Sequence, residues 1–178
     1  MREFFLLGDR LGFSTWTAGD KDLAHQLWGD PQVSRYICAA GVFTPEEIDE
    51  RLELEMANQA QYGYSYWPIF TRGGGHFVGC CGLRPKSEGV LELGCHLLPR
   101  FWGQGYAQEG CRMVIRYAFE TLGAQALFCG HNPNNTASAK LIGKLGFTYL
   151  GTEFYPPTGL DHPSYEMKRP ATYDLERS

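Results

Sequence analysis

Apolar residues recur at helical spacing over one long segment of the chain. From Ala107 to Leu122 they stand three or four positions apart, which predicts an amphipathic helix, and Gly123 directly after them is a helix stop signal. The segment just before, Val90–Leu98, is mostly apolar and is bounded by a glycine and a proline, so it predicts a strand. A strand, a glycine-containing turn and a long helix therefore follow one another in the middle of the chain.

Upstream of this pair, the pattern predicts helices that alternate with strands. Residues 44–47 have the sequence of a capping box, which marks the start of a helix expected to end near Gly63. Asp20 is a candidate N-cap for an earlier helix, and Asp30 precedes a proline that opens another. Strands are expected over residues 11–16, 64–71 and 76–83.

Downstream of the pair, strand and helix patterns continue towards the end of the chain. Asn134 or Asn135 is expected to cap a helix that stops at Gly146. A turn is expected over residues 85–89 and a long loop over residues 155–163. Further strands are expected over residues 126–130, 147–154 and 164–168.

The order of these elements predicts an α/β fold, a three-layer sandwich of helices around a central sheet of about seven strands. Most strands follow one another as meanders, whereas the segments around the long helix make a crossover, so the sheet should be mixed. We expect residues 1–170 to form a single domain and residues 171–178 to form a C-terminal tail.

Composition excludes several classes of function. The chain has 178 residues, 43% hydrophobic and 20% charged, with a formal net charge of −4, which argues against nucleic acid as a partner. No apolar run reaches transmembrane length, and the apolar stretch near the N-terminus is too short for a signal peptide. The six cysteines form no Cys-x-x-Cys pair, so no zinc or redox motif is indicated. We therefore expect a cytoplasmic protein without a metal and without a membrane partner.

The turn between the strand and the long helix carries the first candidate chemistry. Gly103 and Gly105 allow the backbone to turn sharply and to approach a ligand closely. The first N–H groups of a helix lack partners within the helix, and the helix dipole adds positive charge there, so such a turn suits a pyrophosphate. The other interpretation is a tight turn whose glycines serve geometry alone.

Two motifs in the expected order distinguish between these interpretations. The segment from Arg100 to Ala107, Arg-x-x-Gly-x-Gly-Tyr-Ala, resembles the pyrophosphate-binding motif of the GNAT superfamily of N-acetyltransferases. Together with Glu92-Leu-Gly before it, the segment is similar to the branch related to ribosomal-protein N-terminal acetyltransferases, the RimJ/RimL-like proteins. A second motif, Asn-x-x-Ser ending at Ser138 with Leu-Gly-Phe ending at Phe147, matches the same branch.

The resemblance implies a GNAT-like N-acetyltransferase domain that transfers the acetyl group of acetyl-CoA to a primary amine. The central strand should splay from strand 126–130 to leave a V-shaped opening. Direct attack in a ternary complex is expected, with no metal, and the acceptor is a protein N-terminus or a small-molecule amine. A homodimer is an open alternative to a monomer. Two other functions stay open: a non-catalytic acyl-CoA-binding sensor of the same fold, and an interaction domain without a ligand.

The resemblance also implies which residues hold the donor. Backbone N–H groups of the glycine turn would bind the pyrophosphate. The backbone of the splayed strand would pair with the amides of the pantetheine arm, much as an added strand does. The residues expected to contact acetyl-CoA are His96, Leu97, Leu98, Gly103, Gln104, Gly105, Tyr106, Ala107, Asn135 and Ser138.

Glu92 is the favoured general base, because a carboxylate in the middle of an otherwise apolar strand is not expected to serve only as a solvated surface group. It would act through a water molecule. Strand alternation puts His96 on the same face, and imidazole titrates near neutral pH, so His96 is the second candidate. The alternatives are a structural carboxylate for Glu92 and a wall of the pocket for His96.

Ser138 is the candidate acid that protonates the departing thiolate, as the resemblance implies, and Tyr165 is a second candidate. A serine near a helix start is as often bonded to local backbone, and a tyrosine in the last strand is more often core. Cys95 offers a two-step variant in which its thiol carries the acetyl group.

The acceptor side is the least defined part of the sequence. The early helices and the late loop usually form it in this family. Lys140 and Lys144 share one helix face and are candidates for contact with CoA phosphates, although solvated lysines are the simpler interpretation. The aromatic and histidine candidates for the acceptor side are Trp28, Tyr36, Tyr64, Tyr66, Tyr155 and His162.

Overall fold

The computed structural model describes residues 1–171, and all of its strands belong to one sheet. The sheet has eight strands in the order β1–β2–β3–β4–β5–β6–β8–β7, and every neighbouring pair is antiparallel except β5 and β6. The strands are β1 (Leu6–Leu7), β2 (Leu11–Phe13), β3 (Tyr66–Thr71), β4 (Phe77–Ser87), β5 (Val90–Leu97), β6 (Ala126–Gly130), β7 (Thr148–Tyr155) and β8 (Leu160–Lys168).

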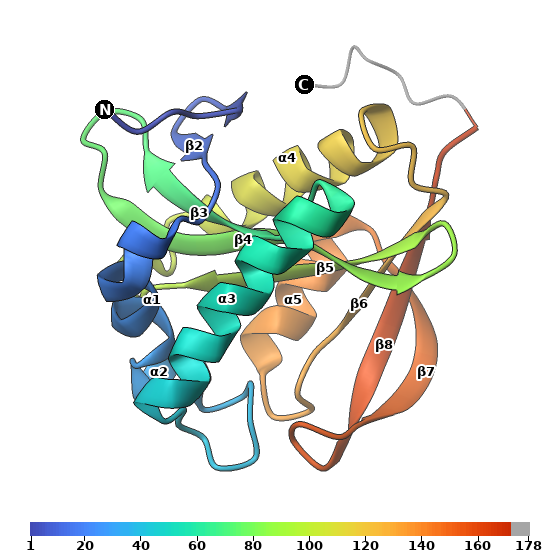
Figure 1. The fold of residues 1–178 in the computed structure, drawn as a ribbon. Coiled ribbons are helices and arrows are strands. Elements are labelled where there is room, and N and C mark those ends of the chain that lie inside the picture. Colours follow the sequence, from blue (N-terminus) through green and yellow to red (C-terminus); the bar gives the residue numbers. More distant parts are fainter. Residues whose placement is uncertain (172–178) are drawn as a thin grey trace.

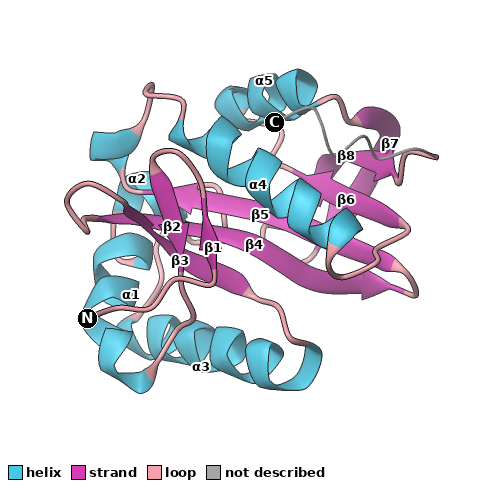
Figure 2. Ribbon diagram, turned by 90° about the horizontal axis from the view of Figure 1, so that it is seen from above, coloured by secondary structure: helices cyan, strands magenta, loops and turns pink. Residues whose placement is uncertain are grey.

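Helices cover both faces of this sheet, so the fold has the three layers that the sequence predicts (Figures 1 and 2). In Figure 2, helices α4 (Tyr106–Glu120) and α5 (Thr136–Leu145) lie over one face, and α1 (Lys21–Trp28) and α3 (Pro45–Tyr62) lie over the other. The remaining helix, α2 (Pro31–Ser34), is a single turn. The α/β class and the mixed sheet are confirmed. The short strand β1 brings the count to eight, where about seven were expected.

Each interface between a helix layer and the sheet has its own buried core. On the α4 side, Val114 and Phe119 pack against sheet residues such as Leu83 and Leu127. On the α1 and α3 side, the core is rich in aromatic residues, including the fully buried Trp28. Burial of large side chains at both interfaces supplies the main force that holds the layers together.

The predicted helix starts are confirmed where a polar side chain satisfies the first N–H groups. At the start of α3, Thr44 Oγ1 accepts from the Glu47 N–H at 3.2 Å, and the Glu47 carboxylate accepts from the Thr44 N–H at 2.7 Å. At the start of α5, Asn135 Oδ1 accepts from the Ser138 N–H at 3.2 Å. Asn135 is therefore the cap of α5, of the two asparagines that the sequence left open.

Asp20 stands at the N-cap position of α1, as predicted, but its side chain makes no capping hydrogen bond, because its carboxylate is used elsewhere. It pairs with Arg2 and accepts hydrogen bonds from the backbone N–H and the hydroxyl of Thr17, at 2.9 and 3.0 Å. Asp20 thus ties the N-terminal segment to the turn before α1. The sequence could not show this, because Arg2 is eighteen positions away.

Two predicted boundaries were wrong for the same reason, since strand pairing continues through prolines. The long loop over residues 155–163 is instead a tight turn after Tyr155, and β8 begins at Leu160 and pairs with β7. Strand β4 likewise continues through Pro85, where its register with β5 shifts. A strand tolerates proline at such an irregularity, where no ladder N–H is needed. The predicted tail falls outside the described residues except for Ala171.

Strands β5 and β6 splay apart, as the family resemblance implies. They pair only over Val90–Ala126, Leu91–Leu127 and Glu92–Phe128, and β5 then continues to Leu97 without β6 beside it. No helix in the described part of the chain is long and apolar enough to cross a membrane.

Candidate active site

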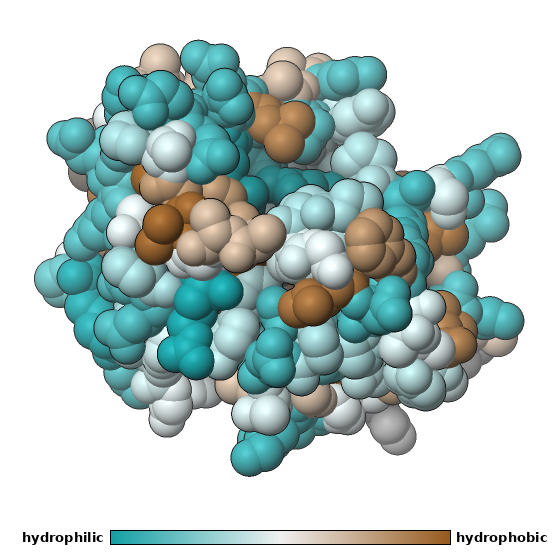
Figure 3. Space-filling model, turned by 90° about the horizontal axis from the view of Figure 1, so that it is seen from below, coloured by the Kyte–Doolittle hydropathy of each residue, from teal (hydrophilic) through white to brown (hydrophobic). Residues whose placement is uncertain are grey.

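A cleft of about 820 Å³ opens where β6 leaves β5. Its walls come from α2, the outer half of β5, the N-terminal end of α4, the length of α5 and the end of β7. The start of α5 and the end of β7 reach the lower side of the molecule in Figure 1, which is the side that Figure 3 shows. Hydrophobic residues lie there in separate patches among hydrophilic ones, so this side suits a ligand with both apolar and polar parts.

The glycine turn before α4 has the geometry of an anion site. Gly103 and Gly105 have φ angles of 69° and 81°, which other residues rarely adopt. Within residues 1–171, none of the backbone N–H groups from position 103 to position 108 donates a hydrogen bond. Gln104, Tyr106 and Ala107 are thus brought together with the two glycines in a turn whose donors are free for an anion.

The side chain of Arg10 contacts this turn and stabilises it, which the sequence did not indicate. Its Nη1 donates to the Gln104 carbonyl at 2.9 Å, and its Nε pairs with Glu109 at 2.6 Å. The guanidinium also lies over the Tyr106 ring, 4.4 Å from its centroid. The acidic partner in the first turn of α4 keeps Arg10 in place and leaves the N–H groups of the turn unobstructed.

Leu98 is not available for the predicted pairing with pantetheine. Its N–H donates to the Val78 carbonyl at 2.9 Å, and its carbonyl accepts from the Phe101 N–H at 2.9 Å. Both backbone groups of Leu98 are therefore satisfied inside the protein.

The open edge of β5 is formed by the alternate residues of the strand. Backbone direction alternates along a strand, so Cys95 and Leu97 face the side that β6 has left, whereas His96 and Leu98 face β4. The Leu97 carbonyl accepts from Trp102 Nε1 at 2.8 Å. The groups left for an added partner are the Leu97 N–H and the backbone of Cys95.

The Glu92 side chain lies in the cleft at the point where β5 and β6 part. It makes no hydrogen bond or ion pair with any described residue. Burial raises the pKa of the Glu92 carboxyl above its ordinary value of 4.5, although Lys86 and Arg84 nearby favour the charged form. A carboxylate with a raised pKa and no structural partner is well suited to accept a proton.

His96 shares the face of Glu92, as predicted, but its environment does not suit a base. Its Nδ1 accepts from Trp28 Nε1 at 3.3 Å, so a neutral ring carries its proton on Nε2. Burial, together with the positive charges of Arg51 and Arg84, lowers the pKa of His96 to about 3. His96 is therefore neutral at physiological pH.

The two acid candidates lie in different places. Ser138 lines the cleft, and its hydroxyl makes no hydrogen bond within the described part of the chain. Tyr165 is not part of the cleft wall; it packs against the core, and its hydroxyl lies 3.2 Å from His131 Nε2. Tyr155 does line the cleft, and burial together with the charge of Glu92 raises its pKa.

The structure separates the acceptor-side candidates into two groups. Trp28 and Tyr64 do not line the cleft, because Trp28 is fully buried beneath His96 and Tyr64 packs against the core. Lys140 and Lys144 lie exposed along the α5 wall. The candidates that line the cleft are Tyr36, Tyr66, Tyr155 and His162.

Comparison with known families identifies the fold. Residues 10–148 match the family described as the acetyltransferase (GNAT) domain, which is more than half of the chain. The chain belongs to the GNAT acetyltransferase family. Its glycine turn and splayed strands are the parts expected from the motifs.

Two relatives of this GNAT protein share about a third of their residues with it over most of its length. YkkB of Bacillus subtilis is 31% identical over 129 residues, which cover 71% of this chain and 74% of YkkB. The FsC-acetyl coenzyme A-N(2)-transacetylase of Aspergillus fumigatus is 34% identical over 155 residues, which cover 79% of this chain and 65% of that enzyme.

Solved GNAT structures share the fold over nearly the whole chain. An acetyltransferase from Bacillus anthracis has a TM-score of 0.79 at 22% identity, over 94% of this chain and 99% of its own. RimL, a ribosomal L7/L12 alpha-N-protein acetyltransferase in complex with coenzyme A, has a TM-score of 0.78 at 15% identity, over 93% and 98%. This likeness is one of fold, and it includes the branch expected from the motifs.

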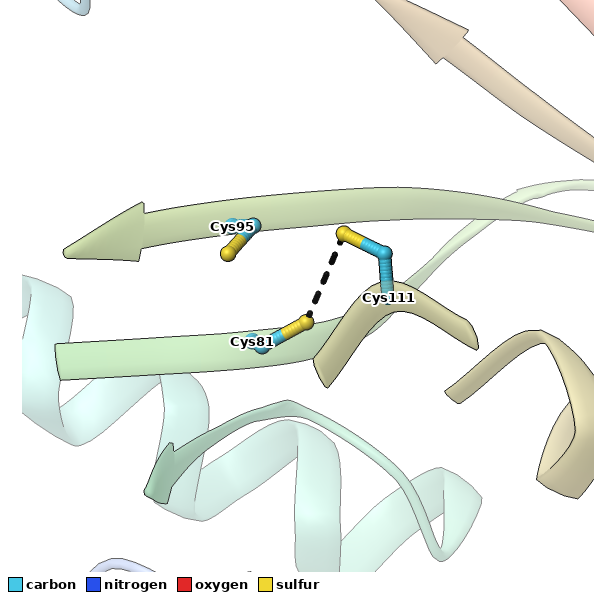
Figure 4. Close-up of side chains that lie close together, drawn as sticks. All are labelled: Cys81, Cys95 and Cys111. Carbon is cyan, nitrogen blue, oxygen red and sulfur yellow. Dashed lines mark hydrogen bonds between the residues drawn. The ribbon is translucent and has the colours of Figure 1, made fainter. Parts of the chain in front are cut away.

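Three thiols meet beside the open edge of β5 in this GNAT protein (Figure 4). Cys81 of β4, Cys95 of β5 and Cys111 of α4 have their sulfur atoms within 4.8 Å of one another. Hydrogen bonds from Cys81 and Cys95 lower the pKa of Cys111, and the same sharing raises the pKa of Cys95. The sequence did not show this cluster, because the three positions meet only when α4 packs on the sheet.

A buried ion pair beneath the acceptor side was also missed from the sequence. Glu55 of α3 is completely buried, pairs with Arg84 of β4 and accepts from the Tyr66 N–H at 2.8 Å. Arg84 in turn lies 4.2 Å from the centroid of the Tyr66 ring. This pair joins the α3 layer to the sheet and holds one wall of the cleft.

Proposed function

We propose that this GNAT acetyltransferase transfers the acetyl group of acetyl-CoA to a primary amine by direct attack in a ternary complex. One observation carries the proposal: the free N–H groups of the glycine turn and the unpartnered carboxylate of Glu92 line the same cleft along β5. The N–H groups suit the pyrophosphate of the donor, and the carboxylate suits removal of a proton from the acceptor amine.

The residues present fit the donor. The turn around Gly103 and Gly105 would hold the pyrophosphate with backbone N–H groups, and the open edge at Cys95 and Leu97 would pair with amides of the pantetheine arm. His96 contributes side-chain surface, because its backbone faces β4. Lys140 and Lys144 lie where phosphate groups outside the turn would meet positive charge. Acetyl-CoA supplies an activated thioester, which an amine can attack without a further cofactor.

Glu92 would remove the proton from the acceptor amine. An ammonium has no lone pair, so the amine must lose a proton before it attacks. Glu92 lies at the point where the strands part, and one water molecule between the carboxylate and the amine completes the transfer. His96 is not the base, since a group with a pKa of about 3 holds a proton too weakly to remove one from an ammonium near neutral pH.

Ser138 would donate a proton towards the departing thiolate of CoA. Its hydroxyl is free and lies at the start of α5, where the helix dipole also stabilises developing negative charge. Tyr165 is less suited, since it does not line the cleft and its hydroxyl is bonded to His131. Asn135 holds the backbone of Ser138 through its side-chain oxygen and so positions this group.

Direct attack is favoured over an acetylated cysteine. Cys95 lines the cleft, but its pKa is raised, so it is a thiol and a poor nucleophile at neutral pH. Cys111 has the lowered pKa, but it is only 2% exposed.

Names of relatives support nitrogen as the acceptor atom. The Aspergillus fumigatus relative is named as an acetyl coenzyme A N(2)-transacetylase, and RimL as an alpha-N-protein acetyltransferase. Both names give nitrogen as the atom that receives the acetyl group. We therefore propose a primary amine, on a protein N-terminus or a small molecule, as the acceptor class.

The test is calorimetric titration with acetyl-CoA, followed by a thiol-release assay with a panel of amines and N-terminal peptides. We expect acetyl-CoA to bind without an amine, and CoA thiol to appear only when a suitable amine is added. Binding without thiol release from any amine would support a non-catalytic sensor. Absence of binding would refute the donor site and with it the proposal.

A further inference from the structure

Arg51 stands out among the positive side chains that line the cleft, because each of the others is either paired or exposed. Arg84 is paired with Glu55, and Lys86 is paired with Glu153 at 2.6 Å. Arg51, by contrast, makes no hydrogen bond or ion pair with any residue of the described range 1–171, and its Nε is buried without a partner. A guanidinium nitrogen that is buried without a partner is costly unless a ligand satisfies it.

The Arg51 side chain is held in place by aromatic rings. Its guanidinium carbon lies 5.0 Å from the Trp28 ring centroid and 4.7 Å from that of Phe43. Stacking of this kind fixes the plane of the guanidinium without using any of its N–H donors. Burial and the charge of Arg84 lower the pKa of Arg51, because both make the charged guanidinium less favourable. A bound anion would offset both effects.

Arg51 is connected through Trp28 and His96 to the face of β5 that carries the proposed base, Glu92. Trp28, which stacks on Arg51, also donates to His96. His96 lies four residues beyond Glu92 on the same face of β5, about 13 Å along the strand. An acceptor that presents its amine to Glu92 can therefore extend along β5 towards Arg51.

We propose that Arg51 binds a carboxylate of the acceptor, so that the acceptor is a small amine with a carboxylate at the far end of a short chain. The planar fork of an arginine matches the two oxygens of a carboxylate. The inference rests on the proposed acetyl transfer and narrows its acceptor class. A protein N-terminus carries a carboxylate close to its amine only when its first residues are acidic, so the proposal favours the small molecule.

The test compares two matched series of amines at saturating acetyl-CoA. One is glycine, 3-aminopropanoate, 4-aminobutanoate, 5-aminopentanoate and 6-aminohexanoate, and the other is the n-alkylamines with the same number of methylenes. We expect the kcat/KM of at least one amino acid to exceed that of its alkylamine by roughly 10- to 100-fold, the scale of a hydrogen-bonded charge pair. A ratio near one along the whole series overturns the proposal and leaves acetyl transfer intact.

Variants assign the preference to Arg51. Arg51→Met keeps the packing of the stem between the two rings and removes the donors, so the ratio should fall to about one with alkylamine turnover retained. Arg51→Lys keeps the charge without the fork and should give an intermediate ratio. Arg35→Met is the matched control, because Arg35 is an exposed cation at the same cleft and its loss should leave the ratio unchanged. An unchanged ratio in Arg51→Met overturns the proposal.

A further measurement separates this inference from the proposed function. If neither series is turned over, calorimetric titration of 5-aminopentanoate into the CoA-bound wild type and Arg51→Met decides the point. Binding to the wild type alone supports the carboxylate site although acetyl transfer to these amines has failed. Equal binding or no binding to either protein overturns the site.

Discussion

At the scale of single residues, what matters most in this protein is which polar groups are left without partners. Glu92 lies in the cleft with no hydrogen bond in the described part of the chain, whereas Glu55, on the neighbouring helix, is fully satisfied. Both are glutamates near the same sheet, so residue type alone does not separate them. Burial raises the pKa of Glu92, and a raised pKa without a structural partner is the pattern of a proton acceptor.

Glu92→Gln should change both the activity and its pH dependence. In the wild type, kcat/KM should fall as the pH decreases through the raised pKa of Glu92, because the protonated carboxyl cannot accept a proton. The variant should lose about 10²-fold or more in turnover and should lack this acidic limb. Initial rates of thiol release between pH 5 and pH 9 measure both effects. A variant with the wild-type profile would remove Glu92 from the mechanism.

The same substitution should lower the activity but raise the stability of the folded protein at neutral pH. An acid whose folded-state pKa is raised stabilises the fold below its unfolded pKa, and this contribution is lost as the pH rises through the folded pKa. Ionised Glu92 therefore costs stability at neutral pH. Glu92→Gln should be more stable than the wild type at pH 7, and the difference should vanish below about pH 4. Urea denaturation at both values tests this, and a destabilised variant at pH 7 would contradict the sign.

At the scale of elements, the glycine turn and α4 work as one unit. Gly105 is the N-cap of α4 and has a positive φ, so the turn directs free N–H groups into the cleft. Arg10 reaches from the turn before β2 to hold the turn through Gln104 and Glu109. A loop closed by its neighbours in this way needs little rearrangement when an anion binds.

Gly105→Val should abolish acetyl-CoA binding in a protein that still folds. Valine tolerates a φ of 81° poorly, so the turn should relax and its N–H groups should no longer converge. Gly123→Val is the matched control: Gly123 has a φ of 68° just beyond α4, and a Cβ there meets no other atom. Both variants should lose similar stability, and only Gly105→Val should lose affinity in calorimetry. Retained affinity in Gly105→Val would refute the pyrophosphate assignment.

At the scale of the whole molecule, polar contacts between layers set the position of the cleft walls. The sheet is covered by α4 and α5 on one face and by α1 and α3 on the other (Figure 2). The Glu55–Arg84 pair crosses the second interface, and Arg84 lies beside Glu92 in the register of β4 and β5. The packing of α3 is thus linked to the electrostatics of the site.

Glu55→Gln should destabilise the whole domain, because it removes the fully buried charge that pairs with the partly buried Arg84. The expected loss is about 3–5 kcal/mol in the free energy of unfolding. Glu153→Gln, which removes the exposed partner of Lys86, is the control and should cost at most about 1 kcal/mol. Urea denaturation of the two variants measures the difference. Equal effects would show that the buried pair contributes no more than a surface pair.

The sequence by itself determined the local structure of this protein. Capping residues such as Thr44 and Asn135, stop glycines such as Gly146 and the periodicity of α4 located the helices, because these signals act within a few residues. The ordered motifs predicted the fold, which comparison confirmed, and the alternation of β5 placed Glu92 and His96 on one face.

Only the tertiary structure decided which of these groups are free to act. It showed that the backbone of Leu98 is used by neighbouring segments, that Tyr165 does not line the cleft, and that the lowered pKa of His96 does not suit a base. It also brought together the three thiols and, within residues 1–171, left Arg51 without a hydrogen-bond or ion-pair partner. Hydrogen bonding, burial and charge at a site depend on residues far apart in the chain, and these are placed only when the layers pack.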